Sequence, residues 1–442
     1  MKSILKARQK KLSTILEKNT DLILLLNPHS RKRNNDAHFP YRADSNTFYI
    51  SGLEHENTAV LFYKKNSSLK SICFIPKANK LRDLWEGKTI NKKMATELGF
   101  DEIRDYEELE EEMIHFYSHQ EKGAFTRLYS NIQSNPEHQA WLTRTLKRIP
   151  NVLRAGKSPP QAQIQIENFI GKIRIQKDAH EIQLLKKASE VNVKAHKLLM
   201  QNLNSGMNES EAQGIIEGAF KAYGATCPSY NSIIGAGSNA LCLHYTDNNA
   251  PIKKNDLILV DAGCEYNYYA SDITRCYPAD GEFTDAQKVI YNIVLKIQKN
   301  ALKLCKAGLL PSKLHKKVAS DLEKEIMKSK ILKISPSAFK KKNLIKELFP
   351  HGTGHWIGLD VHDQSPSFEN GKEIPYLKNS VITVEPGIYI PKNCSYIKKE
   401  YRGIGVRIED CLVIKENAKK TINLTEKLPK EIVEIEALMS QN

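Results

Sequence analysis

Short apolar runs alternate with amphipathic segments over the first 160 residues. The apolar run 22–26 has the length of a buried strand, and the β-branched or aromatic runs 47–50, 59–63 and 71–75 are typical of strands. Segment 81–98 has a helical pattern instead. Because strands and helices alternate, this part of the chain is predicted to be an α/β domain with a mixed or parallel sheet.

A polar stretch with two prolines, Ala155–Pro160, then interrupts the pattern. It marks the predicted boundary between an N-terminal domain, 1–165, and a C-terminal domain, 175–442. Beyond it, Asp178 is predicted to cap an amphipathic helix. Helices are expected at 178–202, 208–223, 284–306 and 312–329, with strand pairs near 229–234, 256–277, 380–390 and 403–415. Since these strands do not strictly alternate with helices, the second domain is predicted to be α+β.

Size and composition favour an ordinary globular protein. A chain of 442 residues exceeds what a single core usually holds, and 40% hydrophobic with 26% charged residues is typical of globular chains. No apolar run approaches the roughly 18 residues of a membrane span, and the N-terminus lacks the apolar core of a secretory signal. The eight cysteines are scattered and form no C-x-x-C pair, as expected of reduced thiols. We therefore expect a cytoplasmic protein with no membrane partner.

The net charge of +15 would suit a nucleic-acid-binding protein. However, basic runs such as Lys340–Lys342 and Lys398–Lys399 are short and separated, and none interleaves with aromatic residues as in a single-strand-binding groove. The charge pattern favours a solvated, lysine-rich surface. We expect no nucleic-acid partner.

Two aspartates occupy neighbouring strand-like segments. An apolar run leads into Asp261, and Asp272 follows eleven residues later. If the two strands form a hairpin around Tyr266 and Asn267, Asp261 faces Asp272 with Cβ atoms about 4.5–5.5 Å apart. Two like charges so placed are destabilising unless a cation lies between them. The pair is consistent with a divalent metal site; the alternative is a different register that leaves one aspartate in solvent.

Histidines and glycines gather in the fifteen residues 349–363. His351, His355 and His362 occur there together with three glycines. Glycine permits close approach of the backbone, and neutral imidazoles bind metals or relay protons. This is not the helical H-E-x-x-H zinc motif, because the glutamate is missing and the glycines oppose a helix. The cluster favours a functional site over isolated structural histidines.

Two glutamates, Glu385 and Glu409, each lie at or near the end of an apolar, strand-like segment. In the second segment Arg407 shares a face with Glu409, while Val406 and Ile408 share the other. Either glutamate alone is compatible with a solvent-exposed face. Together with the aspartates and histidines, they favour one site.

These segments resemble the pita-bread metallopeptidases, which include methionine aminopeptidase, prolidase and Xaa-Pro aminopeptidase. The resemblance to bacterial Xaa-Pro aminopeptidases is closer and extends over nearly the whole chain. The further similar segments are Pro40–Arg42, Pro228–Asn231, His244–Thr246, Tyr401–Gly405 and Glu434–Met439. The resemblance implies an α+β fold with a C-terminal pita-bread domain, similar to creatinase and methionine aminopeptidase, preceded by a smaller α/β domain.

The resemblance also implies the roles of individual residues. The implied ligands of two divalent metal ions are Asp261, Asp272, His355, Glu385 and Glu409. The implied catalytic residues are His244, His351, His362, Glu385 and Arg407, with Glu385 as the acid/base group. The implied substrate-binding residues are Tyr230, Tyr389, Asp36, Trp85 and Arg154. The last three match positions at the mouth of the site, contributed partly by a neighbouring subunit, so a homo-oligomer (dimer or tetramer) is expected; packing of Trp85 within its own domain, with Asp36 capping a local turn, is the alternative.

Four carboxylates and one imidazole form an oxygen-rich donor set that suits Mn²⁺, with Zn²⁺, Co²⁺ and Fe²⁺ as alternatives. The function implied by the resemblance is hydrolytic release of the N-terminal residue from peptides with proline in the second position. Prolidase, which cleaves Xaa-Pro dipeptides, is the alternative on the same scaffold. A catalytically inactive or nucleic-acid-binding relative is the alternative of a different class.

Overall fold

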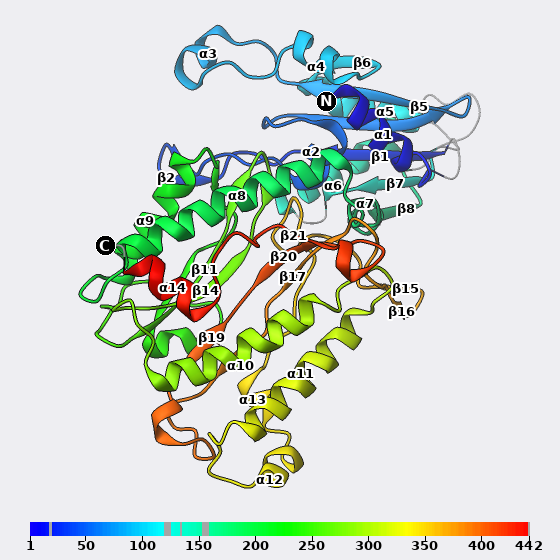
Figure 1. Cartoon of the computed structure of the whole chain (residues 1–442). Coiled ribbons are helices and arrows are strands. Elements are labelled where there is room, and N and C mark those ends of the chain that lie inside the picture. The colour runs from blue at the N-terminus through cyan, green and yellow to red at the C-terminus, as the bar shows by residue number, and fades with distance from the viewer. Residues whose placement is uncertain (17–19, 119–124, 133–134, 153–158, 441–442) are drawn as a thin grey trace. The chain divides into compact units, whose positions relative to one another are not determined.

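The computed structural model of the chain describes residues 1–16, 20–118, 125–132, 135–152 and 159–440. It divides into two compact units, an N-terminal unit (Met1–Ile173) and a C-terminal unit (Arg174–Asn442) (Figure 1). Each unit has a hydrophobic core of its own. The polar stretch predicted to mark the boundary lies mostly outside the described residues. Within the described residues, no helix is both long and apolar enough to span a membrane.

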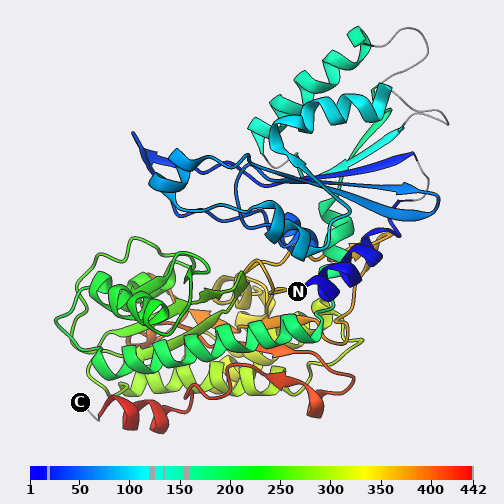
Figure 2. The same cartoon turned by 90° about the horizontal axis from the view of Figure 1, so that it is seen from above.

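The described part of the N-terminal unit is built on one mixed sheet with the strand order β6-β5-β4-β1-β7-β8, blue to teal in Figure 2. Its strands are β1 (Asp21–Leu26), β4 (Ala59–Lys65), β5 (Ser68–Ile75), β6 (Glu102–Asp105), β7 (Arg127–Ser130) and β8 (Ala162–Gln165). Strand β1 is antiparallel to β4 and parallel to β7, and all its residues are buried. The predicted α/β domain is therefore confirmed.

Helices and a short ribbon complete this unit. They are α1 (Lys2–Leu12), α2 (Ser45–Ser51), α3 (Lys80–Glu86), α4 (Lys92–Leu98), α5 (Leu109–Ser118), α6 (Pro136–Val152), α7 (Glu167–Arg174) and the ribbon of β2 (Lys32–Asn34) and β3 (Ala37–His38). The helix expected at 81–98 is two helices, because Gly87 adopts φ +88° and ends α3.

The predicted strand at 47–50 is wrong, because these residues lie in helix α2. Asp44 caps the helix, its Oδ1 accepting from the Thr47 N–H at 2.8 Å. Gly52 ends it in the left-handed region at φ +72°. All seven residues of α2 are buried. The burial and the two caps outweigh the strand preference of the β-branched and aromatic side chains.

The C-terminal unit mixes helices with small antiparallel sheets. Its helices are α8 (Ala179–Asn202), α9 (Glu209–Ala222), α10 (Asp285–Leu302), α11 (Pro311–Lys328), α12 (Pro336–Lys341), α13 (Ile345–Leu348) and α14 (Ile432–Met439), with 3-10 turns η3 (Gly237–Leu241), η4 (Lys399–Tyr401) and η5 (Ala418–Lys420). Helix α8 packs on α9 and on the β12–β13 hairpin, whereas α10 packs on α11 and on β17, β18 and β19 (Figure 1). The expected helices near 178–202, 208–223, 284–306 and 312–329 are confirmed within a few residues.

The strands of this unit carry the candidate residues. They are β9 (Cys227–Pro228), β10 (Ile233–Ala236), β11 (Leu257–Ala262), β12 (Cys264–Tyr266), β13 (Tyr269–Ala270), β14 (Ile273–Pro278), β15 (Phe368–Glu369), β16 (Lys372–Glu373), β17 (Val381–Val384), β18 (Gly387–Tyr389), β19 (Gly405–Arg407), β20 (Asp410–Val413) and β21 (Ile422–Asn423). Most of these strands belong to three sheets, with the strand orders β10-β11-β14, β13-β12-β9 and β17-β20-β21. Strand β18 pairs with β19.

The predicted register of the aspartate hairpin is wrong by two residues. Asp261 pairs with Thr274, not with Asp272. The turn is formed by Asn267 and Tyr268, which have φ of +46° and +71°, as a tight two-residue hairpin turn requires. Since side chains alternate between faces, Asp272 lies diagonally from Asp261 on the same face. The two carboxylates therefore still converge.

Candidate metal centre

Asp261 and Asp272 meet at the hydroxyl of Tyr230. Asp261 lies on β11, and Asp272 lies between β13 and β14. The Tyr230 hydroxyl is 2.6 Å from Asp261 Oδ1 and 2.5 Å from Asp272 Oδ1. The close approach of the two backbone segments depends on Gly263, because a Cβ at this position would lie 1.9 Å from the Ser271 carbonyl oxygen. A hydroxyl has one proton, so it can donate a hydrogen bond to only one of these oxygens at a time.

His355 is held with one ring nitrogen facing the carboxylates. Its Nδ1 is 3.0 Å from the carbonyl oxygen of Trp356 and donates to it, and its Nε2 lies 3.4 Å from Asp272 Oδ2. A backbone acceptor of this kind fixes the ring of metal-binding histidines. The preceding residue must be glycine, because a Cβ on Gly354 would lie 2.0 Å from the Thr383 carbonyl oxygen.

Glu385 and Glu409 complete the cluster from a second pair of strands. Glu385 follows β17, accepts from the Thr383 hydroxyl at 3.1 Å, and lies 3.6 Å from His355 Nε2. Glu409 lies between β19 and β20, and its Oε2 accepts from the Thr274 hydroxyl at 2.7 Å. Its Oε1 is buried and has no hydrogen-bond partner among the described residues. An unpaired buried carboxylate oxygen is costly unless a cation contacts it.

The electrostatics of the cluster show an excess of negative charge. Burial, followed by the charges of Asp272 and Glu385, raises the pKa of Glu409 well above its usual value. Burial also raises the pKa of Glu385 to about 7, although the charge of His355 opposes this shift. Burial lowers the pKa of His355, but the hydrogen bond to Asp272 and the charge of Glu385 outweigh it and give a pKa of about 9. The described side chains of the cluster therefore carry more negative than positive charge, which favours the binding of cations.

The donor set fits divalent metal ions. Asp272, His355 and Glu409 each place one ligand atom within 4.8 Å of the other two. Carboxylate oxygens with one imidazole nitrogen are suitable ligands for several divalent first-row metals. The unpaired Glu409 oxygen and the surplus of negative charge both favour metal binding.

A pocket of about 550 Å³ contains the centre. It is lined by Tyr230, Asn231, Ile233, Leu243, His244, Thr246, Asp261, Asp272, His351, Gly352, Gly354, His355, Val361, His362, Glu385, Arg407 and Glu409. The structure therefore brings the five predicted ligands together with the three further histidines. Asn231, Leu243, Thr246 and Val361 were not singled out from the sequence. All four are next to or two residues from predicted site residues.

Arg407 and Tyr389 connect Asp261 of the centre to His351. Arg407 is buried, and its Nη2 donates to Asp261 Oδ2 at 2.6 Å. Its Nη1 donates to the Tyr389 hydroxyl at 2.7 Å, which lies 2.9 Å from His351 Nε2. Burial, followed by the neighbouring charge of Arg407, lowers the pKa of His351 to about 4. His351 is therefore neutral at pH 7.

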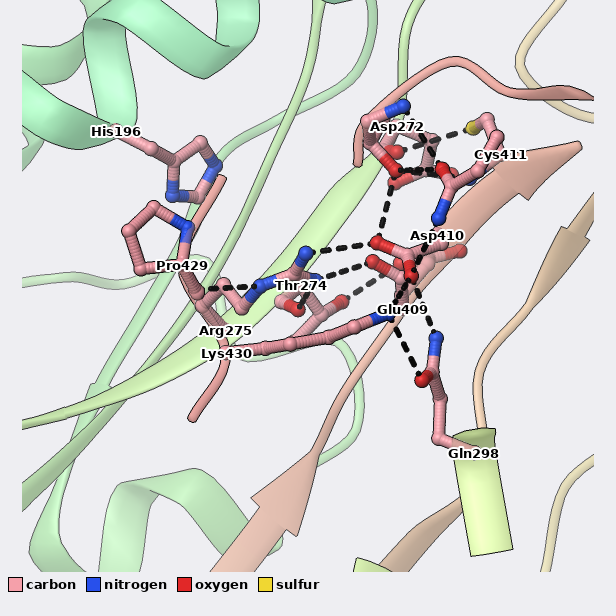
Figure 3. A network of polar contacts seen from close by, with 12 residues as sticks. His196, Asp272, Thr274, Arg275, Gln298, Glu409, Asp410, Cys411, Pro429 and Lys430 are labelled. Atoms are coloured by element: carbon pink, nitrogen blue, oxygen red, sulfur yellow. Dashed lines mark hydrogen bonds and ion pairs between the residues drawn. The ribbon is translucent and has the colours of Figure 1, made fainter. Parts of the chain in front are cut away.

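Sequence reasoning missed the polar network behind Glu409, shown in Figure 3. Arg275 Nη1 donates to the carbonyl oxygens of Thr274 and Glu409, and its Nη2 donates to Asp410 Oδ1 at 2.7 Å. Lys430 donates to the other oxygen of Asp410 at 2.5 Å. The start of strand β14, next to Asp272, is thereby fixed to the start of β20, next to Glu409. One signal in the sequence was available for Thr274. Side chains alternate between the two faces of a strand, which places Thr274 on the same face as Asp272.

Three predicted substrate-binding residues belong to the N-terminal unit. Arg154 lies outside the described residues. Asp36 is exposed between β2 and β3. Trp85 on α3 is 80% exposed, so it does not pack within its own domain in this chain. A role for them at the mouth of the site stays a prediction.

The comparisons with known proteins define first the class of protein. Residues 183–416 match Metallopeptidase family M24, and residues 5–125 match the Aminopeptidase P, N-terminal domain. The match to the M24 family covers more than half of the chain and contains all five candidate ligands. The chain therefore belongs to metallopeptidase family M24.

Individual proteins are also similar to this chain over nearly its whole length. The Xaa-Pro aminopeptidase of Escherichia coli is 34% identical over 418 residues, 92% of this chain and 91% of the relative. That of Haemophilus influenzae is 33% identical over 423 residues, 95% of this chain and 93% of the relative. Among solved structures, proline aminopeptidase P II from Yersinia pestis matches with TM-score 0.93 and 29% identity over 100% of both chains. Aminopeptidase P from E. coli with the inhibitor Pro-Leu matches with TM-score 0.92 and 30% identity, over 100% of this chain and 98% of that one. The predicted resemblance and the pita-bread fold are confirmed.

Proposed function

We propose that the chain is a metal-dependent aminopeptidase that releases the N-terminal residue from peptides with proline in the second position. The observation that carries the proposal is the carboxylate and imidazole cluster in a pocket, where the buried Glu409 Oε1 has no hydrogen-bond partner among the described residues. Relatives named Xaa-Pro aminopeptidases match 92–95% of this chain, which favours this activity over that of prolidase.

We propose two Mn²⁺ ions as the resident metals, held by Asp261, Asp272, His355, Glu385 and Glu409. Four carboxylates balance the charge of two divalent ions, and the oxygen-rich set suits Mn²⁺. When bound, two such ions would lower the pKa of a water molecule and polarise a carbonyl. Metal analysis of the protein as purified tests both identity and number; a single equivalent of metal at full activity would contradict the count.

Glu385 is the proposed group that moves the proton. Its Oε2 lies 3.7 Å from His351 Nδ1, and its Oε1 is held by the Thr383 hydroxyl. From this position Glu385 takes the proton from the attacking water and passes it to the leaving nitrogen. The nitrogen of an Xaa-Pro bond carries no N–H, so the site does not need an acceptor for a hydrogen bond from it.

His244 and His362 are the proposed donors to the carbonyl oxygen of the scissile bond. Both line the pocket. The His362 ring packs edge-on against the His355 ring, with centroids 4.3 Å apart. Burial, followed by the charge of His355, lowers the pKa of His362, so this ring is neutral at pH 7 and carries one N–H to donate. Such donors stabilise charge that develops in the transition state.

The substrate preference is tested with three short peptides. We expect kcat/KM for Ala-Pro-Ala to exceed that for Ala-Ala-Ala, because the pocket must favour the rigid proline ring. Ala-Pro is the control for dipeptidase activity. Cleavage confined to Ala-Pro would assign prolidase activity, and equal cleavage of both tripeptides would remove the proline requirement.

We also propose that the chain is active as a homo-oligomer, a dimer or tetramer, in which Asp36, Trp85 and Arg154 lie at the mouth of a pocket. The support is the resemblance at these positions and the exposed apolar surface of α3, where Leu81, Leu84 and Trp85 are 67%, 79% and 80% exposed. Light scattering measures the solution mass, and Trp85→Ala should lower it or raise KM. An active species that is strictly monomeric would contradict this arrangement.

The proposed location is the cytoplasm. All eight cysteines lie in the described residues and are free thiols, as in proteins of reducing compartments. Cell fractionation that placed the chain outside the cytoplasm would contradict the proposal.

A further inference from the structure

The segment that carries His244 has little regular structure of its own. Among the described residues between β10 and β11, the only helical element is the turn η3. His244 lies three positions after the end of this turn. The His244 ring lines the pocket, and no hydrogen bond joins it to any described residue. Its position must therefore come from the way the surrounding backbone is held.

Glu209 holds this segment at points on both sides of His244. The carboxylate is completely buried at the first residue of α9. Its Oε1 accepts from the Ala236 N–H at 2.8 Å and from the Asn239 side-chain amide at 2.9 Å. Its Oε2 accepts from the Tyr245 hydroxyl at 2.8 Å and from the Ala250 N–H at 2.9 Å. Tyr245 is the direct neighbour of His244.

The four partners of Glu209 all donate, so the position requires an ionised carboxylate. Each carboxylate oxygen accepts two hydrogen bonds, and a charged acceptor makes each of them stronger than a neutral one. A glutamine of the same shape would direct its NH₂ group at the N–H of Ala236 or of Ala250 and leave that donor without its acceptor. Leaving a buried donor unpaired costs more than the hydrogen bond itself contributes.

Capping of helix α9 does not explain Glu209. The cap is Asn208, whose side chain accepts from the Ser210 N–H, while the Glu211 carboxylate accepts from the Asn208 N–H in a capping box. All four hydrogen bonds of the Glu209 carboxylate go to the segment 236–250 instead. A buried charge directed entirely at one loop points to a function of that loop.

We propose that Glu209 is a positioning residue that sets His244 in the pocket, an inference that rests on the proposed function of the pocket. Tyr245 transmits the restraint, because its hydroxyl is shared by Glu209 and by the Asn239 amide at 3.1 Å. Glu209 is not among the residues that line the pocket, so it acts through His244 and not on the substrate.

The test compares Glu209→Gln with Glu211→Gln, which makes the same chemical change two residues away in the same turn. For Glu209→Gln we expect kcat for Ala-Pro-Ala to fall on the order of 10–10²-fold, as for a displacement of about 1 Å. Bound metal should equal that of the parent. Glu211→Gln should keep the parent kcat, because its carboxylate contacts only the helix cap. A parent-like kcat in Glu209→Gln, or an equal loss in both variants, would overturn the proposal.

Hydrogen exchange provides a readout that does not depend on turnover. The amides of peptides covering 236–250 should exchange faster in Glu209→Gln than in the parent, and those of α10 should not. Faster exchange throughout the C-terminal unit would assign a general structural role and overturn the proposal. If the parent itself does not turn over peptides, the proposed function fails while this measurement still decides whether Glu209 holds the loop.

A double-mutant cycle with His244→Ala separates positioning from stability. If Glu209 acts through His244, Glu209→Gln should lower kcat little further once His244 is absent, whereas independent effects would multiply. Multiplicative losses would contradict the proposal. If Glu209→Gln fails to fold, Tyr245→Phe is the alternative variant, because it removes one of the four donors and keeps the carboxylate. The same cycle with Tyr245→Phe should give a smaller loss of kcat that is equally non-additive.

Discussion

Glu409→Ala and Asp272→Ala are expected to abolish peptide hydrolysis and to lower the amount of bound divalent metal. Glu409 supplies a buried oxygen that no described residue contacts, and Asp272 lies with it and His355 in the cluster whose ligand atoms are within 4.8 Å. Removing either carboxylate leaves the centre with fewer oxygen ligands. Turnover of Ala-Pro-Ala and metal content by elemental analysis are the two measurements.

The matched control is Asp280→Ala, which removes an exposed carboxylate beyond the end of β14. Asp280 accepts from the Ser205 hydroxyl and the Asn255 N–H and does not line the pocket. Its variant should retain metal and turnover. The parent should lose activity on chelation and regain it with Mn²⁺. Full activity after complete removal of metal would show that the centre does not use metal at all.

The second large effect is expected from His362→Ala and His244→Ala. Each should lower kcat about 10²–10³-fold, the loss typical of removing one donor to a developing oxyanion. Bound metal should stay at the parent level, because neither ring belongs to the cluster of candidate ligands. Single-turnover kinetics would separate this loss from slow product release.

His180→Ala is the control for the histidine variants, since His180 lies in the first turn of α8 and does not line the pocket. It should match the parent in rate and metal content. Loss of a full equivalent of metal from His244→Ala or His362→Ala would make that histidine a ligand. Unchanged kcat in both variants would remove their proposed part in the transition state.

Local signals in the sequence were sufficient for several elements of the fold. Asp178 caps α8 with Glu181 in a capping box, and the helix begins where the side-chain pattern predicted it. A cap involves residues three apart, so its information is contained in the neighbouring sequence. In α2 the cap was also present, as Asp44, but the β-branched and aromatic run concealed it.

The composition of the metal centre was likewise accessible from the sequence, because its ligands occur in short segments with a specific order that resembles a known family. The contacts that join these segments were not. Pairing of Asp261 with Thr274 was decided by a turn at Asn267 and Tyr268, and a turn shifted by one residue moves every pair by two. Local sequence alone did not decide between these registers.

Short sequence segments thus specify which residue types reach the centre, whereas contacts between distant segments specify how these residues are held. Glu209 is an example: nothing near it in the sequence distinguishes it from Glu211, yet one carboxylate is completely buried and the other exposed. Its four partners lie 27 to 41 residues away. A buried charge is tolerated only where distant groups satisfy it, and such distant partners are fixed by folding of the whole chain.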